Sequence, residues 1–215
     1  KMIGLDLGLR QVRACEMVAH FSATEPKALY QMPVHRSDNE SLLYAQLRAV
    51  KNMLSIHEMN DVVLACALPR QLTSTMVLTI PFDKPSLIEE VLPGFIDERV
   101  PLDVEDLVYD VQVTQQGEGE TELLVAYTTK EAFDLCYATF LEVGLDPKIL
   151  TLGGLSFINL VSDGLFQDED DSIAILDLGE QGSEWVIISE GKVKLVQRSD
   201  VGGREITRAL ARTFK

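Results

Sequence analysis

The chain has 215 residues, of which 46% are hydrophobic and 25% are charged, a size and balance typical of a soluble globular protein with one large domain or two smaller ones. Its 19 Lys and Arg against 34 Asp and Glu give a net charge of −15, which repels nucleic acid and anionic lipid, so we expect neither as a direct partner. The three histidines and three cysteines lack metal-ligand spacing, and no apolar stretch reaches the ~20 residues of a membrane span.

The first third of the chain predicts three strands, a helix and a fourth strand. The strands are Met2–Leu7, Val12–Ala19, Lys27–Val34 and, after the helix, the nearly all-apolar Asp61–Leu68. The helix is expected over 40–57, with Asp38 or Asn39 as its cap, because apolar residues recur there at spacings of three and four. This order, β-β-β-α-β, is the core of a ribonuclease-H-like lobe.

The middle of the chain predicts a smaller α+β subdomain. A break or kink is expected at Pro93-Gly94 inside its first helix, and Gly144 is expected to end its second helix. The β-α-β-β-α-β string from 74 to 151 therefore looks like an insert. Its expected elements are strand Thr73–Ile80, helix Pro85–Arg99, strands Leu107–Thr114 and Glu122–Thr129, helix Glu131–Val143 and strand Lys148–Thr151.

The last part of the chain repeats the opening order of elements. A helix over 153–165 and an acidic linker over 167–171 are expected first. Three strands and a helix then give β-β-β-α for the second time. These are expected at Ser172–Asp177, Glu184–Ser189, Lys192–Arg198 and, after Gly202-Gly203, Arg204–Phe214.

The tetrapeptide Leu-Asp-Leu-Gly occurs twice, at Leu5–Gly8 and at Leu176–Gly179, each time at the end of an apolar run. Each copy predicts a buried strand, an acidic residue near its tip, a glycine turn and a returning strand. Two such hairpins, one opening each half of the chain, are what a nucleotide cleft between two lobes requires.

In the functional interpretation, the hairpins hold a nucleotide. An aspartate at each strand tip would hold Mg²⁺ through water, and backbone N–H groups of the glycine turns and of the helix that starts at Gly202 would face the phosphates. The residues expected to bind nucleotide are Asp6, Gly8, Leu9, Arg10, Asp177, Gly179, Ser183, Gly202 and Gly203, with Asp6 and Asp177 also at the metal.

In the structural interpretation, both turns are only hairpins and bind no ligand. Leu9-Arg10 replaces the small hydroxyl residue that nucleotide-binding relatives usually carry after the first glycine. Glu180 and Glu184 would lie near the phosphates, where like charges at about 4 Å repel by several kcal/mol. Because no nucleophile and base are paired, we expect no catalytic residue and at most a weak ATPase.

Several segments resemble one known family. The chain is similar to the PilM/GspL family of actin-like proteins, related to FtsA, which serve type IV pilus assembly and type II secretion. A sugar kinase of the same superfamily would need a catalytic Asp beside a sugar pocket in the first lobe, and this chain shows no such loop. The chaperone branch would carry a second loop rich in glycine and threonine, where this chain has Gly-Glu-Gln. The matching segments are Leu68-Pro69, Ile80-Pro81, Asp97–Leu102, Leu123–Lys130, Gly144–Pro147 and Val201–Thr207, besides the two Asp-x-Gly hairpins.

The resemblance implies an α/β fold with an actin-like (ribonuclease-H-like) lobe, an inserted α+β 1C subdomain and the start of a second ribonuclease-H-like lobe. Lobe 1A would span 1–73, subdomain 1C 74–151, a return to lobe 1A with a linker 152–171, and a truncated lobe 2A 172–215. ATP and Mg²⁺ are the cofactors implied. A cytoplasmic location is implied as well, and the acidic apolar start predicts no signal peptide.

Two hypotheses remain from the sequence. In the first, the chain is a scaffold that reaches the inner membrane only through partners. It binds either the cytoplasmic tail of a PilN-like membrane protein or a GspE-like secretion ATPase. By resemblance, the tail would lie in a groove formed around Leu78–Phe82, Val100–Leu102 and Leu123–Tyr127, although most of the apolar residues among them are expected to be core. In the second, the chain is an FtsA-like switch that responds to ATP.

Overall fold

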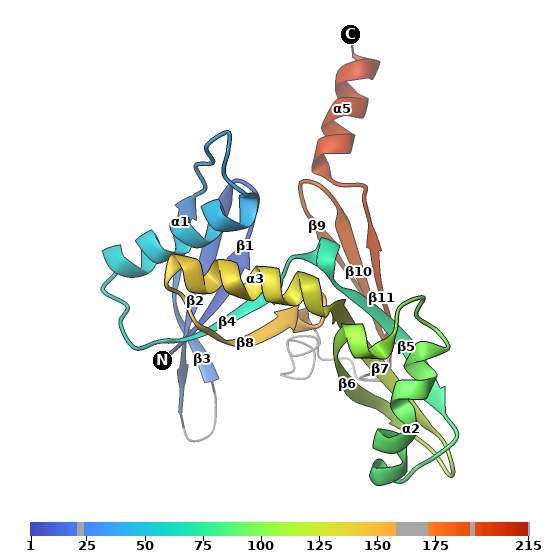
Figure 1. Ribbon diagram of the computed structural model, residues 1–215. Coiled ribbons are helices and arrows are strands. Elements are labelled where there is room, and N and C mark those ends of the chain that lie inside the picture. Colours follow the sequence, from blue (N-terminus) through green and yellow to red (C-terminus); the bar gives the residue numbers. More distant parts are fainter. Residues whose placement is uncertain (21–23, 158–171, 190–191, 215) are drawn as a thin grey trace. The chain divides into compact units, whose positions relative to one another are not determined.

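The structure is a computed structural model that describes residues 1–20, 24–157, 172–189 and 192–214 (Figure 1). The chain divides into two compact units, each described below by itself. The first unit comprises Lys1–Arg70 and Ala132–Leu152, and the second comprises Gln71–Glu131 and Gly153–Lys215. Among the described residues, no helix is long and apolar enough to cross a membrane.

The first unit is built on a five-stranded mixed sheet in the order β3-β2-β1-β4-β8. Strands β1, β2 and β3 are antiparallel to one another, whereas β4 and β8 run parallel to β1. Their bounds are β1 Met2–Leu7, β2 Gln11–Ala19, β3 Thr24–Pro33, β4 Val63–Leu68 and β8 Pro147–Leu152. The segment 132–152, which the sequence places at the end of the insert, thus lies in the first unit, because β8 pairs with β4.

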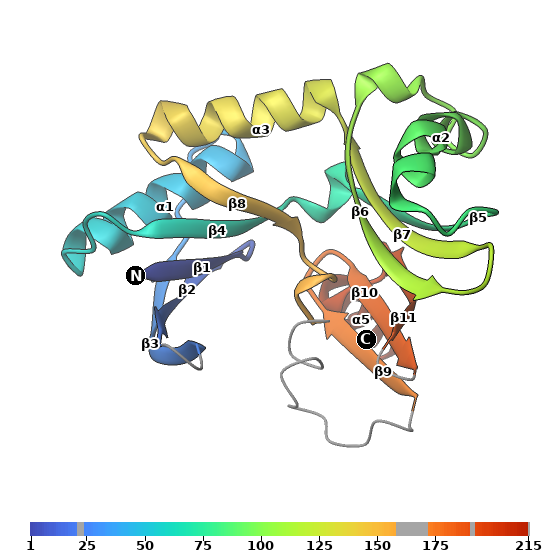
Figure 2. The same cartoon turned by 90° about the horizontal axis from the view of Figure 1, so that it is seen from below.

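Two helices, α1 (Leu42–Ile56) and α3 (Lys130–Val143), cover one face of this sheet (Figure 2). The cap of α1 is Ser41 rather than the expected Asp38 or Asn39, because the Ser41 Oγ accepts from the Tyr44 N–H at 3.1 Å. The predicted end of α3 is confirmed. Gly144 has φ +80°, and Lys51 Nζ donates to the Val143 carbonyl.

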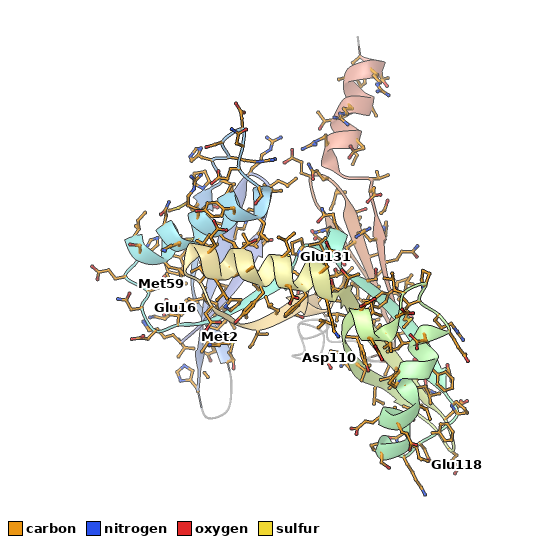
Figure 3. The ribbon with its side chains drawn as sticks, in the orientation of Figure 1. Met2, Glu16, Met59, Asp110, Glu118 and Glu131 are labelled. Carbon is orange, nitrogen blue, oxygen red and sulfur yellow. The ribbon has the colours of Figure 1, made fainter. Side chains whose placement is uncertain are left out.

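One carboxylate of the first unit, that of Glu16 on β2, is buried beside two exposed lysines. Glu16, labelled in Figure 3, is 4% exposed. Its oxygens accept from Lys27 Nζ and from the Tyr30 hydroxyl, both at 3.0 Å. The Lys27 bond holds the pKa of Glu16 below its usual range, and the same carboxylate raises the pKa of Tyr30. Because these bonds satisfy the buried charge, Glu16 serves packing and is not a ligand-binding candidate.

The second unit holds two three-stranded antiparallel sheets, in the orders β5-β7-β6 and β11-β10-β9. The first of these sheets carries helix α2 (Pro85–Asp97) on one face, and α5 (Gly203–Thr213) follows the second sheet. The strands are β5 Ser74–Ile80, β6 Leu107–Gln116, β7 Thr121–Thr129, β9 Ile173–Leu178, β10 Ser183–Ser189 and β11 Lys192–Ser199.

Successive side chains of β7 point to opposite sides of the sheet, and side chains on both of these sides are buried. Leu123 packs with the α2 core, and the next residue, Leu124, packs with Val186 and Ile188 of β10. Helix α2 continues through Pro93, so the predicted break is absent. Its buried face, Ile88, Leu92 and Ile96, keeps the helix on the sheet despite the missing N–H of proline.

Two expectations from the sequence fall mainly on residues outside the described ranges. Of the helix expected over 153–165, only 153–157 is described, where Leu155 and Phe157 pack against Val186 and its neighbours. The acidic run 167–171 lies entirely outside the described residues. The three cysteines carry free thiols, and burial raises the pKa of Cys66 to about 12.

Candidate functional site

The first Leu-Asp-Leu-Gly copy forms the hairpin expected from the sequence. Leu7 at the end of β1 pairs with Val12 of β2, and four residues, 8–11, make the turn. A Cβ on Gly8 would lie 2.6 Å from the Gln11 carbonyl oxygen, so only glycine fits this position. Gly8 is therefore required by the turn itself, whether or not the hairpin binds a ligand.

Asp6 is paired across the hairpin with Arg13. The Arg13 Nη1 lies 2.9 Å from Asp6 Oδ2, and both side chains are more than half exposed. The carboxylate expected to hold Mg²⁺ thus already has a cation beside it. Among the residues that the structure describes, no three His, Cys, Asp or Glu side chains gather as metal ligands.

Gln46 of α1 positions the first turn, a contact that the sequence analysis did not anticipate. This side chain is 5% exposed, and its Nε2 donates to the carbonyls of Leu7 at 2.8 Å and Gly8 at 3.0 Å. Its spacing is a signal that could have revealed it. Gln46 lies three residues after Leu43 and four before Val50, on the apolar face of the helix.

We expect Gln46→Leu to lower the free energy of unfolding by about 1–3 kcal/mol, because two hydrogen bonds worth about 0.5–1.5 kcal/mol each are lost. Urea unfolding followed by far-UV circular dichroism measures this loss, and amide exchange should quicken at residues 8–11. Gln31→Leu, on the exposed side of β3, is the matched control and should stay within about 0.5 kcal/mol of the wild type. Equal effects of the two variants would show that Gln46 does not hold the turn.

The second copy forms a hairpin with the same register as the first. Leu178 pairs with Ser183 as Leu7 pairs with Val12, again with four residues between them. Gly179 N donates to the Gly182 carbonyl at 2.9 Å and closes the turn. Ser183, an expected nucleotide ligand, is 5% exposed.

The start of α5 is bonded to this second turn. The N–H groups of Gly203 and Arg204 donate to the carbonyls of Gly179 and Glu180, both at 2.9 Å. The N–H of Gly202 donates to the Glu205 carboxylate at 3.2 Å. These are the donors expected to face a phosphate, so a phosphate would have to displace bonds that already exist within the protein.

Glu180 and Glu184, the two glutamates expected to repel a phosphate, each contact other groups of the protein. Glu180 Oε1 lies 3.4 Å from Arg204 Nη2, and this cation offsets its charge. Glu184 is 9% exposed, and its carboxylate lies against Gly153 and Gly154. A Cβ on Gly154 would come within 2.8 Å of the Glu184 Cδ. The charge repulsion argued from the sequence is therefore weaker at Glu180 than expected.

The two hairpins differ in what covers them. In the first copy, Leu5 is 7% exposed and packs in the core that α1 completes. The matching residue of the second copy, Leu176, is 45% exposed, and its cross-strand partner Trp185 is 43% exposed. No residue of α5 is buried within the described part of the chain. Asp6 and Asp177 belong to different units, so their joint binding of Mg²⁺ stays a prediction.

The segments expected to form a peptide groove are largely core. Within them, Leu78, Ile80 and Val100 are at most 5% exposed and pack under α2, as do Leu123 and Val125. Leu102 is 45% exposed, and Thr79, Pro81 and Pro101 are exposed as well. The structural alternative stated from the sequence therefore holds for most of these residues.

Comparisons with known proteins show what this fold is similar to. No family model and no curated protein matches the chain. Among solved structures, the chain is similar to a chain of the PilM-PilN type IV pilus biogenesis complex, with a TM-score of 0.81 and 20% identity, over 99% of this chain and 65% of that one. It is also similar to the cytoplasmic domain of EpsL, an inner-membrane component of the type II secretion system of Vibrio cholerae, with a TM-score of 0.52 and 16% identity, over 98% and 74%.

These likenesses establish the fold. The mixed α/β, actin-like architecture expected from the sequence is confirmed, and so, at the level of the fold, is the resemblance to PilM and GspL. The chain spans about 65% of the length of the PilM-PilN complex chain that it matches.

Proposed function

We propose that the chain is a cytoplasmic, actin-like scaffold of the inner-membrane platform in a type IV pilus or type II secretion machine. It binds the cytoplasmic tail of a PilN-like membrane protein or a GspE-like assembly ATPase. The observation that carries the proposal is the likeness over 99% of the chain to a member of a solved pilus biogenesis complex.

The state of the hairpins favours binding over catalysis. The Asp6 carboxylate is paired with Arg13, and the first N–H groups of α5 have acceptors within the protein. A scaffold needs these hairpins only as rigid structure, whereas a nucleotide site needs the same groups to turn toward a ligand.

The test is a calorimetric titration of the chain with the cytoplasmic tail peptide of the membrane partner, without nucleotide. Binding in the micromolar range is expected, and a scrambled peptide of the same composition should not bind. The purified assembly ATPase is titrated in a second experiment. Absence of binding to both partners at high micromolar concentration would contradict the scaffold.

A second function, a switch that closes on Mg-ATP, is favoured by two observations. The two Leu-Asp-Leu-Gly hairpins have the same register and loop length, and Arg204 offsets the charge of Glu180. If this function holds, Asp6→Ala and Asp177→Ala each abolish ATP binding, measured with a fluorescent ATP analogue and Mg²⁺. Unchanged binding in both variants would exclude it.

A further inference from the structure

Strand β6 is an outer strand of its sheet and carries exposed apolar side chains. In the order β5-β7-β6 it lies beside β7 alone among the described strands (Figure 2). It is ten residues long. Exposure of one side of the strand rises from 4% at Leu107 to 37% at Val111 and 55% at Val113. The cross-strand partners of these two valines, Val125 and Leu123, are buried under α2. The apolar surface under α2 therefore continues, uncovered, to the edge of the sheet.

The backbone of β6 is open toward this edge at Val111. The N–H of Val111 donates to the carboxylate of its neighbour Asp110 at 2.8 Å. Because alternate residues of an edge strand direct both backbone groups away from the sheet, Tyr109 and Val113 share this orientation. Edge strands bind extended peptides through such groups, and adjacent side-chain surfaces supply the specificity.

The surroundings of β6 are strongly acidic. The segment 81–122 contains 12 Asp and Glu against 2 Lys and Arg. Asp110 lies on the strand and Glu118 at the far end of the hairpin that joins β6 to β7 (Figure 3). Glu105 and Asp106 are exposed just before the strand. A basic segment is attracted to this surface, whereas the β6 of a second copy is repelled by the same charges.

We propose that the β6 edge binds a basic, extended segment of a partner protein as an added strand. The Asp110 carboxylate then leaves the Val111 N–H, which donates to a carbonyl of the incoming segment, and pairs with one of its Lys or Arg side chains. Alternate aliphatic side chains of the segment pack on Val111 and Val113. This inference deepens the proposed scaffold function, since it gives the bound tail a place and a chemistry.

The test uses a fluorescently labelled peptide that alternates lysine and valine, and a counterpart with glutamate for lysine. Anisotropy titrations compare the wild type with Val111→Pro, which removes the outward N–H and no bond to β7, and with Asp110→Lys. Each variant should weaken binding of the lysine peptide at least about tenfold, equivalent to about 1.4 kcal/mol. Glu142→Lys, an identical charge change at an exposed position of α3 outside the acidic segment 81–122, is the control and should bind within about twofold of the wild type.

Amide exchange of the wild type is a second measurement that does not depend on the folding of any variant. The lysine peptide should slow exchange at Tyr109, Val111 and Val113 and leave β5 unchanged. Unchanged exchange on β6, equal binding of the glutamate peptide, or a β6-linked dimer in sedimentation would overturn the proposal. A titration with the partner's tail distinguishes failure of the β6 edge site from failure of the scaffold function. Tail binding that both β6 variants retain overturns only the edge site, whereas absence of binding of the wild type to both the tail and the assembly ATPase overturns the scaffold.

Discussion

Replacing Phe140 by alanine is expected to lower the free energy of unfolding by about 3–5 kcal/mol, because the substitution leaves a cavity where a large buried ring was packed. Phe140 is 1% exposed on α3 and belongs to the core that joins this helix to the first sheet. A loss of this size is a large share of the ~5–15 kcal/mol that stabilises a typical domain. Urea unfolding followed by far-UV circular dichroism measures it.

Leu135→Ala on the same helix is the matched control. Leu135 is 67% exposed, so its truncation opens no cavity and should change the free energy of unfolding by less than about 0.5 kcal/mol. Similar losses in the two variants would mean that α3 does not pack through Phe140.

Gly202→Ala is expected to destabilise the second unit by about 2–4 kcal/mol. Its Cβ would lie 2.4 Å from the Gly182 nitrogen and 2.7 Å from the carbonyl oxygens of both Glu180 and Gly179, all of them backbone atoms. The second turn must therefore move, which adds overpacking of about 1–3 kcal/mol to the weakening of the bonds that join it to α5. The φ of Gly202 is −134°, so the cost comes from the contacts and not from the backbone angle.

The single tryptophan, Trp185, lies on β10 beside this turn, and its fluorescence during urea unfolding reports the effect. Gly94→Ala in α2 is the control, because a Cβ there meets no atom within 4 Å. Alanine should stabilise that helix by about 0.5–1 kcal/mol. A Gly202→Ala protein with the same free energy of unfolding as the wild type would show that the close contact of α5 with the second turn does not stabilise the fold.

The hydrogen bonds between the start of α5 and the second turn bear on function. The N–H groups of Gly203 and Arg204 hold the second turn in the structure, and the same groups were expected to bind phosphate. A switch would need them to exchange one set of acceptors for another. A scaffold uses them as they are. The Gly202→Ala variant therefore also offers a comparison: if it loses stability but keeps tail binding, the hairpin is structural support for a binding surface elsewhere.

The strands and most helices followed from local patterns. The two Leu-Asp-Leu-Gly copies, their glycine turns and their returning strands were predictable, because hairpin register depends on a few adjacent residues. Gly144 ended α3 as predicted for the same reason. At Pro93 the sequence predicted a break or a kink, and the break is absent because the burial of Ile88, Leu92 and Ile96 holds the helix on the sheet.

The sequence by itself thus determined the hairpins, the repeated β-β-β-α frames and the actin-like resemblance. Only the tertiary structure decided which groups at the turns are already bonded. Gln46 meets Leu7 from 39 residues away, and the N–H of Arg204 meets the carbonyl of Glu180 from 24 residues away, after the chain has passed through β10 and β11. Likewise, β8 pairs with β4 in the first unit, although the sequence placed it at the end of the insert. Such pairings depend on how separate elements pack, and no local spacing encodes the distance between two segments that meet only in the folded chain.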